Sequence, residues 1–183
     1  VTLYWDRSAE STQDKYMGNI TNGNDLYDFE GYKIYRATDF EFNDAYNITD
    51  GDGNPTFLEP YVQNGVRAQW DLVDGKSGWH PVDLNGIKFY LGDDTGLTHS
   101  YVDHNVVNGQ RYYYAVVSYD YGGDLSNNII PSDSPMKLRV NPLTGAVSLG
   151  PNVVEVVPSP PSAGFVDASF AGDQVDHVFG ASS

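Results

Sequence analysis

Hydrophobic and polar residues alternate in short stretches along the first 140 residues of the chain. Val1, Leu3 and Trp5 occupy alternate positions, and so do Tyr32 and Ile34. Successive side chains of a β-strand point to opposite faces, so this period of two predicts strands with one buried face. The pattern predicts strands at residues 1–5, 29–36, 67–73, 87–91, 99–103, 110–119 and 136–140.

The strongest predicted strand is the segment 110–119, which contains three consecutive tyrosines. Aromatic and β-branched side chains fit the pleated, half-buried surface of a sheet. The polar segment 6–28 is expected to be a loop, and helix is expected to be minimal. The inward faces of the strands predict a shared core of Val1, Leu3, Trp5, Tyr32, Ile34, Tyr114 and Val116.

Turn signals separate short strand candidates throughout residues 38–98. Asn64-Gly65 and Asn85-Gly86 suit tight hairpins because both central residues can adopt a positive φ. The composition changes after Pro142, since residues 143–183 contain neither Lys nor Arg. Two strand-like runs, 146–149 and 153–157, precede a proline-rich stretch there, which favours extended backbone. We therefore expect a sandwich at 1–140 and an extended C-terminal arm at 141–183.

Three segments together resemble a fibronectin type III domain. Residues 1–5 resemble the second strand of that fold with its core tryptophan, and 31–36 resemble its third strand. Residues 101–116 resemble the strand, turn and strand that carry the family's corner tyrosine. The resemblance implies that the Tyr112 hydroxyl ties this turn to the sheet. Asn108 stands where the family usually has proline.

The resemblance implies an all-β, fibronectin type III/immunoglobulin-like antiparallel β-sandwich with 38–98 as a long insertion. It also implies that 136–140 is the last strand. The family's first strand would precede Val1, so either the chain was cut there or that strand comes from elsewhere. The segments 29–36, 91–96 and 152–158 also look like modules within large secreted proteins of environmental bacteria.

The charge balance is strongly acidic, with 25 Asp and Glu against 10 Lys and Arg, a net charge of −15. Such a charge argues against binding to nucleic acid and to anionic membranes. There is no cysteine, which excludes disulfides and thiol catalysis. No apolar run approaches the roughly 18 residues of a membrane span. We expect an extracellular or cell-surface protein that does not insert into membranes.

No catalytic motif is apparent in the sequence. The four histidines, which are His80, His99, His104 and His177, form no metal-ligand pair. Ser100, Asp103 and His104 occur close together, but neighbouring residues of a strand point to opposite faces and do not converge as a catalytic triad requires. We therefore predict that the chain is not an enzyme.

Asp50, Asp52 and Asn54 form the segment most similar to a metal site. Oxygen-bearing side chains at alternate positions, spaced by glycine, resemble the start of a calcium loop. Tyr61 stands where such a loop would carry its bidentate glutamate, and Asp-Gly repeats are also ordinary turns. Ca²⁺ binding and a simple turn both remain open, and Asp93-Asp94 is a weaker second candidate.

Asn19 and Asn47 each begin a glycosylation sequon, which matters only in a host that uses such sites; a chance match is the alternative. Trp70 and Trp79 lie in the insertion among many tyrosines. Exposed aromatic rings can stack on sugars, whereas buried rings stabilise cores or interfaces. Both interpretations remain open for the two tryptophans.

The leading functional hypothesis is a structural subunit of an extracellular filament or surface polymer. A strand from one copy would complete the sheet of the next, giving a head-to-tail homopolymer; the alternative is that the arm folds back on its own chain. The second hypothesis is a carbohydrate-binding or accessory module of a larger secreted protein. The predicted subunit contacts are Val147, Leu149, Val153, Val154, Val156, Val157, Phe165, Phe170 and Phe179.

Overall fold

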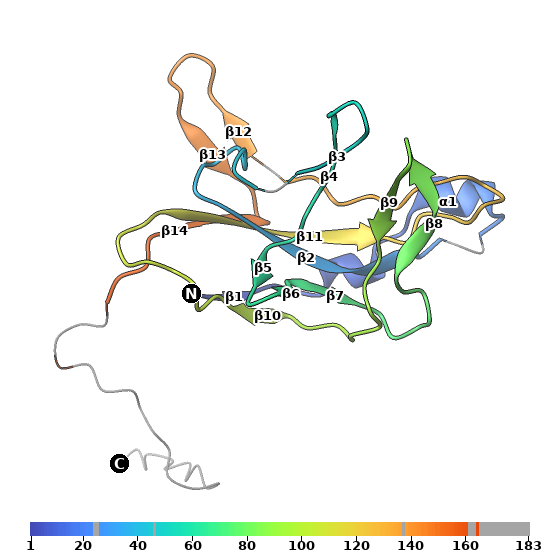
Figure 1. Ribbon diagram of the computed structural model, residues 1–183, viewed down its shortest axis with the longest axis horizontal. Coiled ribbons are helices and arrows are strands. Elements are labelled where there is room, and N and C mark those ends of the chain that lie inside the picture. Colours follow the sequence, from blue (N-terminus) through green and yellow to red (C-terminus); the bar gives the residue numbers. More distant parts are fainter. Residues whose placement is uncertain (24–25, 46, 137, 161–163, 165–183) are drawn as a thin grey trace, which may run out of the picture.

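Two long neighbouring strands, β2 (Phe29–Ala37) and β11 (Tyr112–Asp120), cross the middle of the molecule (Figure 1). They belong to a computed structural model that describes residues 1–23, 26–45, 47–136, 138–160 and 164, and the side chain of Asn47 lies outside the described set. The strands pair antiparallel, with Tyr114 opposite Arg36. The chain is an all-β, sandwich-like fold of antiparallel sheets.

The main sheet has four strands in the order β14-β11-β2-β7. β7 (Gln69–Asp71) pairs with β2, and β14 (Val153–Val156) pairs with β11. Almost every residue of β2 and β11 is buried or half-buried, because other elements cover both faces of the two strands. β11 accordingly appears in the sequence as a nearly continuous run of aromatic and aliphatic residues.

A two-stranded layer of β1 (Thr2–Tyr4) and β10 (Ser100–Val102) packs on one face of the main sheet. Leu3, Ile34 and Tyr114 meet in the core between them, and Tyr32 is buried beside Trp5. The remaining residues of the predicted core, Val1, Trp5 and Val116, are half-buried and pack against it. The predicted core is therefore confirmed, with its outer members partly exposed.

The opposite face of the main sheet carries a second hydrophobic cluster. Tyr35, Tyr113 and Val117 are buried there together with Phe42 and Val153. The cover on this face comes from the loop that follows β2, which carries Phe42, and from the half-buried side chains of Leu58, Met136 and Leu149. Both faces of the sheet are thus buried. Successive side chains of β11 pack into the two clusters in turn, with Tyr113 on this face and Tyr114 on the other.

The insertion 38–98 is a series of short hairpins around β7. They are β3 (Asn47–Thr49) with β4 (Pro55–Leu58), β5 (Val62–Gln63) with β6 (Val66–Arg67), and β8 (Trp79–Leu84) with β9 (Ile87–Tyr90). Asn64-Gly65 and Asn85-Gly86 form two of the turns with positive φ at both residues, as predicted.

The segment 6–28 contains two short helical elements where we expected a loop. They are η1 (Ser8–Ser11), a 3₁₀ turn, and α1 (Lys15–Ile20). The Asp14 carboxylate caps α1 by accepting hydrogen bonds from the backbone N–H groups of Tyr16 and Met17. Within the described residues, no helix has the length and apolar character needed to cross a membrane.

The prediction that residues 136–140 form the last strand of the sandwich is wrong. β12 (Leu138–Val140) pairs with β13 (Val147–Leu149) in a separate hairpin that projects from one end of the molecule (Figure 1). The place beside β11 belongs to β14, because Val153 is only 6% exposed in the core whereas Val140 is 41% exposed. The main sheet therefore extends past residue 140, where we placed the end of the sandwich.

The predicted role of Tyr112 is confirmed. Its hydroxyl oxygen accepts a hydrogen bond of 3.0 Å from the backbone N–H of Val107. This bond joins the start of β11 to the turn five residues earlier, so the turn between β10 and β11 is held against the sheet.

Candidate functional site

The predicted calcium loop forms the turn of the β3–β4 hairpin. The Asp50 carboxylate accepts hydrogen bonds from the backbone N–H groups of Asn54, at 2.9 Å, and Asp52, at 3.0 Å. The Asn54 side-chain amide donates to the same carboxylate, and these bonds lower the pKa of Asp50. The side chains of Asp50 and Asn54 and the backbone N–H of Asp52 thus act in a turn, and Ca²⁺ binding at this loop stays a prediction.

The histidines are dispersed, and Asp103 does not contact His104 in the described hydrogen bonds. His80 is buried with its Nε2 2.7 Å from the carbonyl oxygen of Gly123, and His99 contacts Glu10. Asp103 instead accepts hydrogen bonds from Arg36 and the Tyr114 hydroxyl. His177 lies outside the described residues.

Sequence reasoning missed one acidic cluster, formed by Asp14, Asp28 and Asp120. One carboxylate oxygen of each lies within 4.8 Å of the others. Burial raises the pKa of Asp120, although Ser132 donates two hydrogen bonds to its carboxylate. Asp14 caps α1, so two of the three acids already have structural roles. Their wide separation in sequence left no local pattern to detect.

The main candidate site is a pocket of about 610 Å³, which we call the aromatic pocket. It lies between the β5–β6 hairpin, β7, the end of β9 and the loop that follows β9. Trp70, Tyr90 and Tyr101 supply its aromatic lining, and the polar residues of the pocket include Gln63, Asn64, Arg67, Asp93 and Thr95.

One wall of the aromatic pocket is anchored in the core. The rings of Trp70 and Tyr101 have centroids 5.5 Å apart, and Trp70 also packs on Trp5 at 5.7 Å. Burial raises the pKa of Tyr101 to about 12, and its hydroxyl is buried without a hydrogen-bond partner among the described residues. The ring of Tyr101, rather than its hydroxyl, is therefore the part that lines the pocket.

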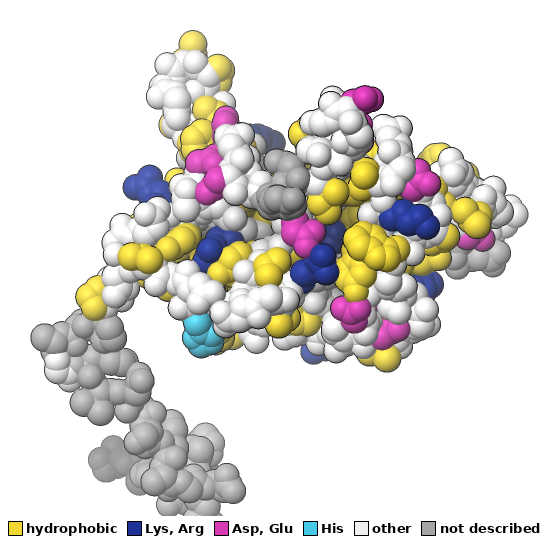
Figure 2. Space-filling view, in the orientation of Figure 1, with side chains coloured by type: hydrophobic (Ala, Val, Ile, Leu, Met, Phe, Trp, Pro, Cys, Tyr) yellow, Lys and Arg dark blue, Asp and Glu magenta, His cyan; other side chains and the backbone are white. Residues whose placement is uncertain are grey.

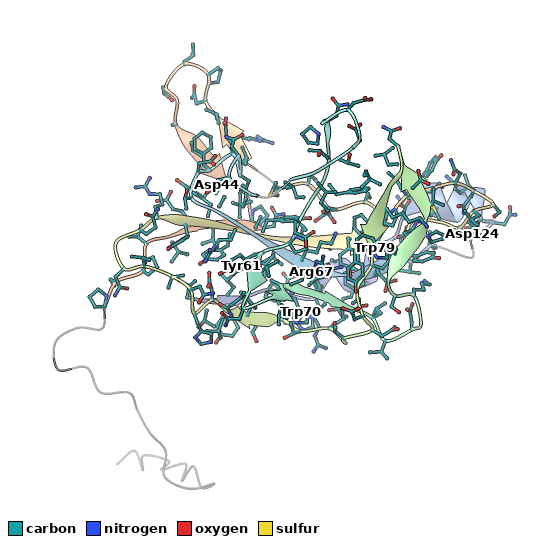
Figure 3. The ribbon with its side chains drawn as sticks, in the orientation of Figure 1. Asp44, Tyr61, Arg67, Trp70, Trp79 and Asp124 are labelled. Carbon is teal, nitrogen blue, oxygen red and sulfur yellow. The ribbon has the colours of Figure 1, made fainter. Side chains whose placement is uncertain are left out.

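Tyr90 also lines the aromatic pocket, and two further side chains contact its ring. The exposed Trp79 ring packs against Tyr90 at 5.0 Å, and the Arg67 guanidinium lies 4.9 Å from the Tyr90 ring centroid. Glu59 forms an ion pair with Arg67. Figure 3 shows Arg67 in the region between Trp70 and Trp79, and Figure 2 shows hydrophobic side chains gathered over β8 and β9 beside charged ones.

The polar groups at the rim set the electrostatics of the aromatic pocket. The Tyr90 hydroxyl donates to the Asp93 carboxylate, and this bond raises the pKa of Tyr90. Glu59 neutralises Arg67, while Asp93 is exposed. The pocket thus combines fixed ring faces, hydrogen-bonding groups and a slightly negative rim.

The two tryptophans singled out in the sequence occupy different positions. Trp70 lines the aromatic pocket, whereas Trp79 is outside its lining, packs against Tyr90 and is 58% exposed. Tyr90 and Tyr101 were not predicted as site residues. Only the pairing of distant strands brings them together, although the abundance of tyrosine in the insertion was a weak signal.

The predicted subunit contacts are found in several places. Val147 is exposed in β13, while Leu149 packs against the core. Val153 and Val156 belong to β14 and pack against the chain's own core, while Val154 and Val157 are partly exposed. Phe165, Phe170 and Phe179 lie outside the described residues. Within this chain, then, the run 153–157 already has a partner strand.

The first sequon is accessible, since Asn19 is exposed on α1. The backbone of Asn47 begins β3, and its side chain is outside the described set.

Comparison with protein-family models, with curated proteins and with solved structures finds no match. The function must therefore be argued from the chain's own geometry.

Proposed function

We propose that this chain is a non-catalytic, extracellular β-sandwich module that binds uncharged carbohydrate in the aromatic pocket. The observation that carries the proposal is that three aromatic side chains, Trp70, Tyr90 and Tyr101, line the same pocket. A sugar ring has apolar C–H faces that stack on aromatic rings and hydroxyl groups that need hydrogen-bonding partners. Pockets with an apolar lining and a few placed polar groups suit such ligands.

The charge of the molecule selects against acidic sugars. The net charge is −15, and Asp93 lies at the rim of the pocket. Arg67 is the basic residue of the lining, and Glu59 already pairs with it. An acidic glycan would meet repulsion without an available counter-charge, whereas a neutral one avoids this cost. Ring contacts already hold Trp70 and Tyr90 in place, so these side chains lose less conformational entropy when a ligand binds.

Binding to a glycan array, followed by calorimetry with the strongest neutral oligosaccharide, tests the proposal. Tyr90→Ala is expected to weaken binding by about tenfold, because one stacked ring contributes about 1.4 kcal/mol. Tyr90 is a better target than Trp70, which also packs on Trp5 in the core. Tyr16→Ala, at an exposed position on α1, is the matched control. Absence of glycan binding, or equal affinities of Tyr90→Ala and the unaltered chain, would contradict the proposal.

We also propose that the sandwich is of the fibronectin type III kind. In support, β1 and β10 form one layer, and β14, β11, β2 and β7 form the other. The Tyr112 bond to Val107 matches the corner tyrosine of that family. A fold likeness of this kind says little about function by itself.

The structural-subunit hypothesis remains a second proposal, favoured by the free edge of β1. Among the described strands, β1 pairs with β10 alone, so its other edge has no neighbour. Such an edge is a template for strand addition. The donor proposed here is not the run 153–157, because that run pairs with β11 in its own chain. The remaining predicted contacts, Phe165, Phe170 and Phe179, belong to residues 161–183, and we propose that this segment is the donor.

A further inference from the structure

Lys33 of β2 is a lysine whose amine lies inside the core. Its side chain is only 4% exposed, and its Nζ lies 3.5 Å from the centroid of the Phe89 ring and 4.7 Å from that of Tyr119. Lysine is almost never buried to this degree unless it is paired, because its ammonium loses its hydration. Burial lowers the pKa of Lys33 from its ordinary value, against the opposing attraction of Asp133. Burial therefore favours the neutral amine, which is a nucleophile.

The partner of this amine is the carboxyl group of Asp133. The Nζ of Lys33 lies 3.2 Å from Oδ1 of Asp133, and the Tyr35 hydroxyl donates a hydrogen bond to Oδ2. Lys33 and Tyr35 lie two residues apart on β2, so their side chains share one face of the strand. The two oxygens of one carboxyl group thus contact an amine and a hydroxyl from the same strand.

The backbone holds the amine and the carboxyl group in contact from opposite edges of β11. Lys33 belongs to β2, which pairs with one edge. Asp133 lies in the segment 132–134 on the other edge, where the backbone N–H of Ser134 donates to the carbonyl oxygen of Ser118 at 2.7 Å. Two groups held in contact by a folded backbone react far faster than the same groups free in solution.

We propose that the side chains of Lys33 and Asp133 condense to an amide, which forms a covalent cross-link within the chain. Transfer of one proton from the ammonium to Oδ1 first converts the ion pair into a neutral amine and a carboxylic acid. Nζ then attacks Cγ, and a Nζ–Cγ bond forms. The Cγ–Oδ1 bond breaks, and Oδ1 leaves as water with the proton that it carries and a second proton from the amine. The reaction needs no oxidant and no further reactant.

Tyr35 is placed to assist this step. Burial, and next the adjacent Asp133, raise the pKa of Tyr35 well above its ordinary value, so the hydroxyl keeps its proton. Negative charge develops on Oδ2 when Nζ attacks Cγ, and the Tyr35 hydroxyl donates its hydrogen bond to this oxygen. A fixed donor at the atom where charge develops stabilises the transition state.

Burial also shifts the balance between the ion pair and the amide. In water an amine and a carboxylic acid are ionised and hydrated, which opposes condensation. Inside a protein the two charges lose that hydration, whereas a neutral amide does not carry this cost. The competing state is a buried ion pair whose ammonium lies over the ring of Phe89. The two states differ by the mass of one water molecule.

The test is the intact mass of the full chain, measured in denaturant. The cross-linked chain is expected to weigh one water molecule less than the sum of its residues, and a protease digest should contain a branched peptide that joins Lys33 to Asp133. Lys33→Met keeps an unbranched, apolar side chain without the amine, so it should have the full mass. The branched peptide of the unaltered chain decides the question even if this variant fails to fold.

Lys76→Met is the matched control, because Lys76 pairs with Asp74 at 3.5 Å but has a side chain that is 43% exposed. This variant should keep the mass loss. Tyr35→Phe, which removes only the hydroxyl, is expected to slow cross-linking by about 100-fold.

A full mass for the unaltered chain would overturn the proposal and leave Lys33 and Asp133 as an ion pair. A water loss that maps to an Asp-Gly sequence, such as Asp52-Gly53, would also overturn it, because an aspartate that cyclises on the next backbone nitrogen releases water too. A mass loss that persists in Lys33→Met would have the same meaning.

Discussion

At the scale of single residues, Asp103 is the polar centre of the core between the two layers. It is almost fully buried and accepts hydrogen bonds from Arg36 at 2.9 Å, Tyr114 at 2.8 Å and the backbone N–H of Asn105 at 2.9 Å. Burial opposes ionisation of this carboxyl, but these bonds outweigh it and hold the pKa of Asp103 below its ordinary value of 3.8. Asp103 thus joins β10 to β2 and β11 as a charged group.

Asp103→Ala is expected to lower the free energy of unfolding by about 3 kcal/mol at pH 7, because Arg36 and Tyr114 lose their shared acceptor. A depressed folded-state pKa stabilises the protein above the unfolded pKa, and this contribution disappears as pH falls through the folded value. Urea unfolding at pH 7 and at pH about 2 should therefore show a smaller difference between variant and unaltered chain at the acidic pH. Glu41→Ala, at an exposed acid, is the control; a difference independent of pH would contradict the charged role.

At the scale of elements, β14 attaches the C-terminal region to the sandwich by pairing with β11. It pairs with β11 over four residues, from Tyr112 opposite Val156 to Ala115 opposite Val153. Val153 faces the core and its neighbour Val154 is 43% exposed, as the period of two requires. The two adjacent valines therefore provide a matched pair for testing the pairing.

Val153→Asp is expected to lower the free energy of unfolding by about 3 kcal/mol or more, since it removes a buried side chain and buries an unpaired charge. Val154→Asp should change it by about 0.5 kcal/mol or less, because that side chain faces solvent. Denaturant unfolding of the two variants measures the difference. Equal effects would mean that β14 does not occupy this edge in solution.

At the scale of the whole molecule, the free edge of β1 and the aromatic pocket support different kinds of partner. The pocket needs a small ligand, whereas the edge needs an extended strand. The two surfaces share the layer of β1 and β10, because Tyr101 of β10 lines the pocket. A chain that used both surfaces would bind sugar in the aromatic pocket while the edge of β1 pairs with a strand of another copy.

Electron microscopy of the purified chain tests the assembly proposal, which expects filaments. A chain that ends at residue 160 keeps β14 in its sheet, so it removes the remaining predicted contacts Phe165, Phe170 and Phe179 without unfolding the sandwich. We expect this shorter chain to remain monomeric in sedimentation experiments. Filaments from the shorter chain would show that residues 161–183 are not the donor, and absence of filaments from the full chain would contradict strand donation.

Local features of this protein were predictable from its sequence alone. Alternation placed β1, β2, β9, β10 and β11 correctly because side-chain direction in a strand depends only on parity. Asn64-Gly65 and Asn85-Gly86 formed turns because positive φ is a property of the residues themselves. The bond of Tyr112 to Val107 joins residues five apart in sequence, and the resemblance carried by residues 101–116 implied it.

The pairing of strands and the meeting of distant residues depend on tertiary packing. β12 and β14 are both short hydrophobic runs, and the place beside β11 depends on core contacts that no local pattern encodes. The aromatic pocket joins Trp70, Tyr90 and Tyr101 from three strands. Glu30 is completely buried in β2, although a charged side chain is ordinarily exposed. Packing between distant segments sets these features, because burial depends on everything that covers a residue.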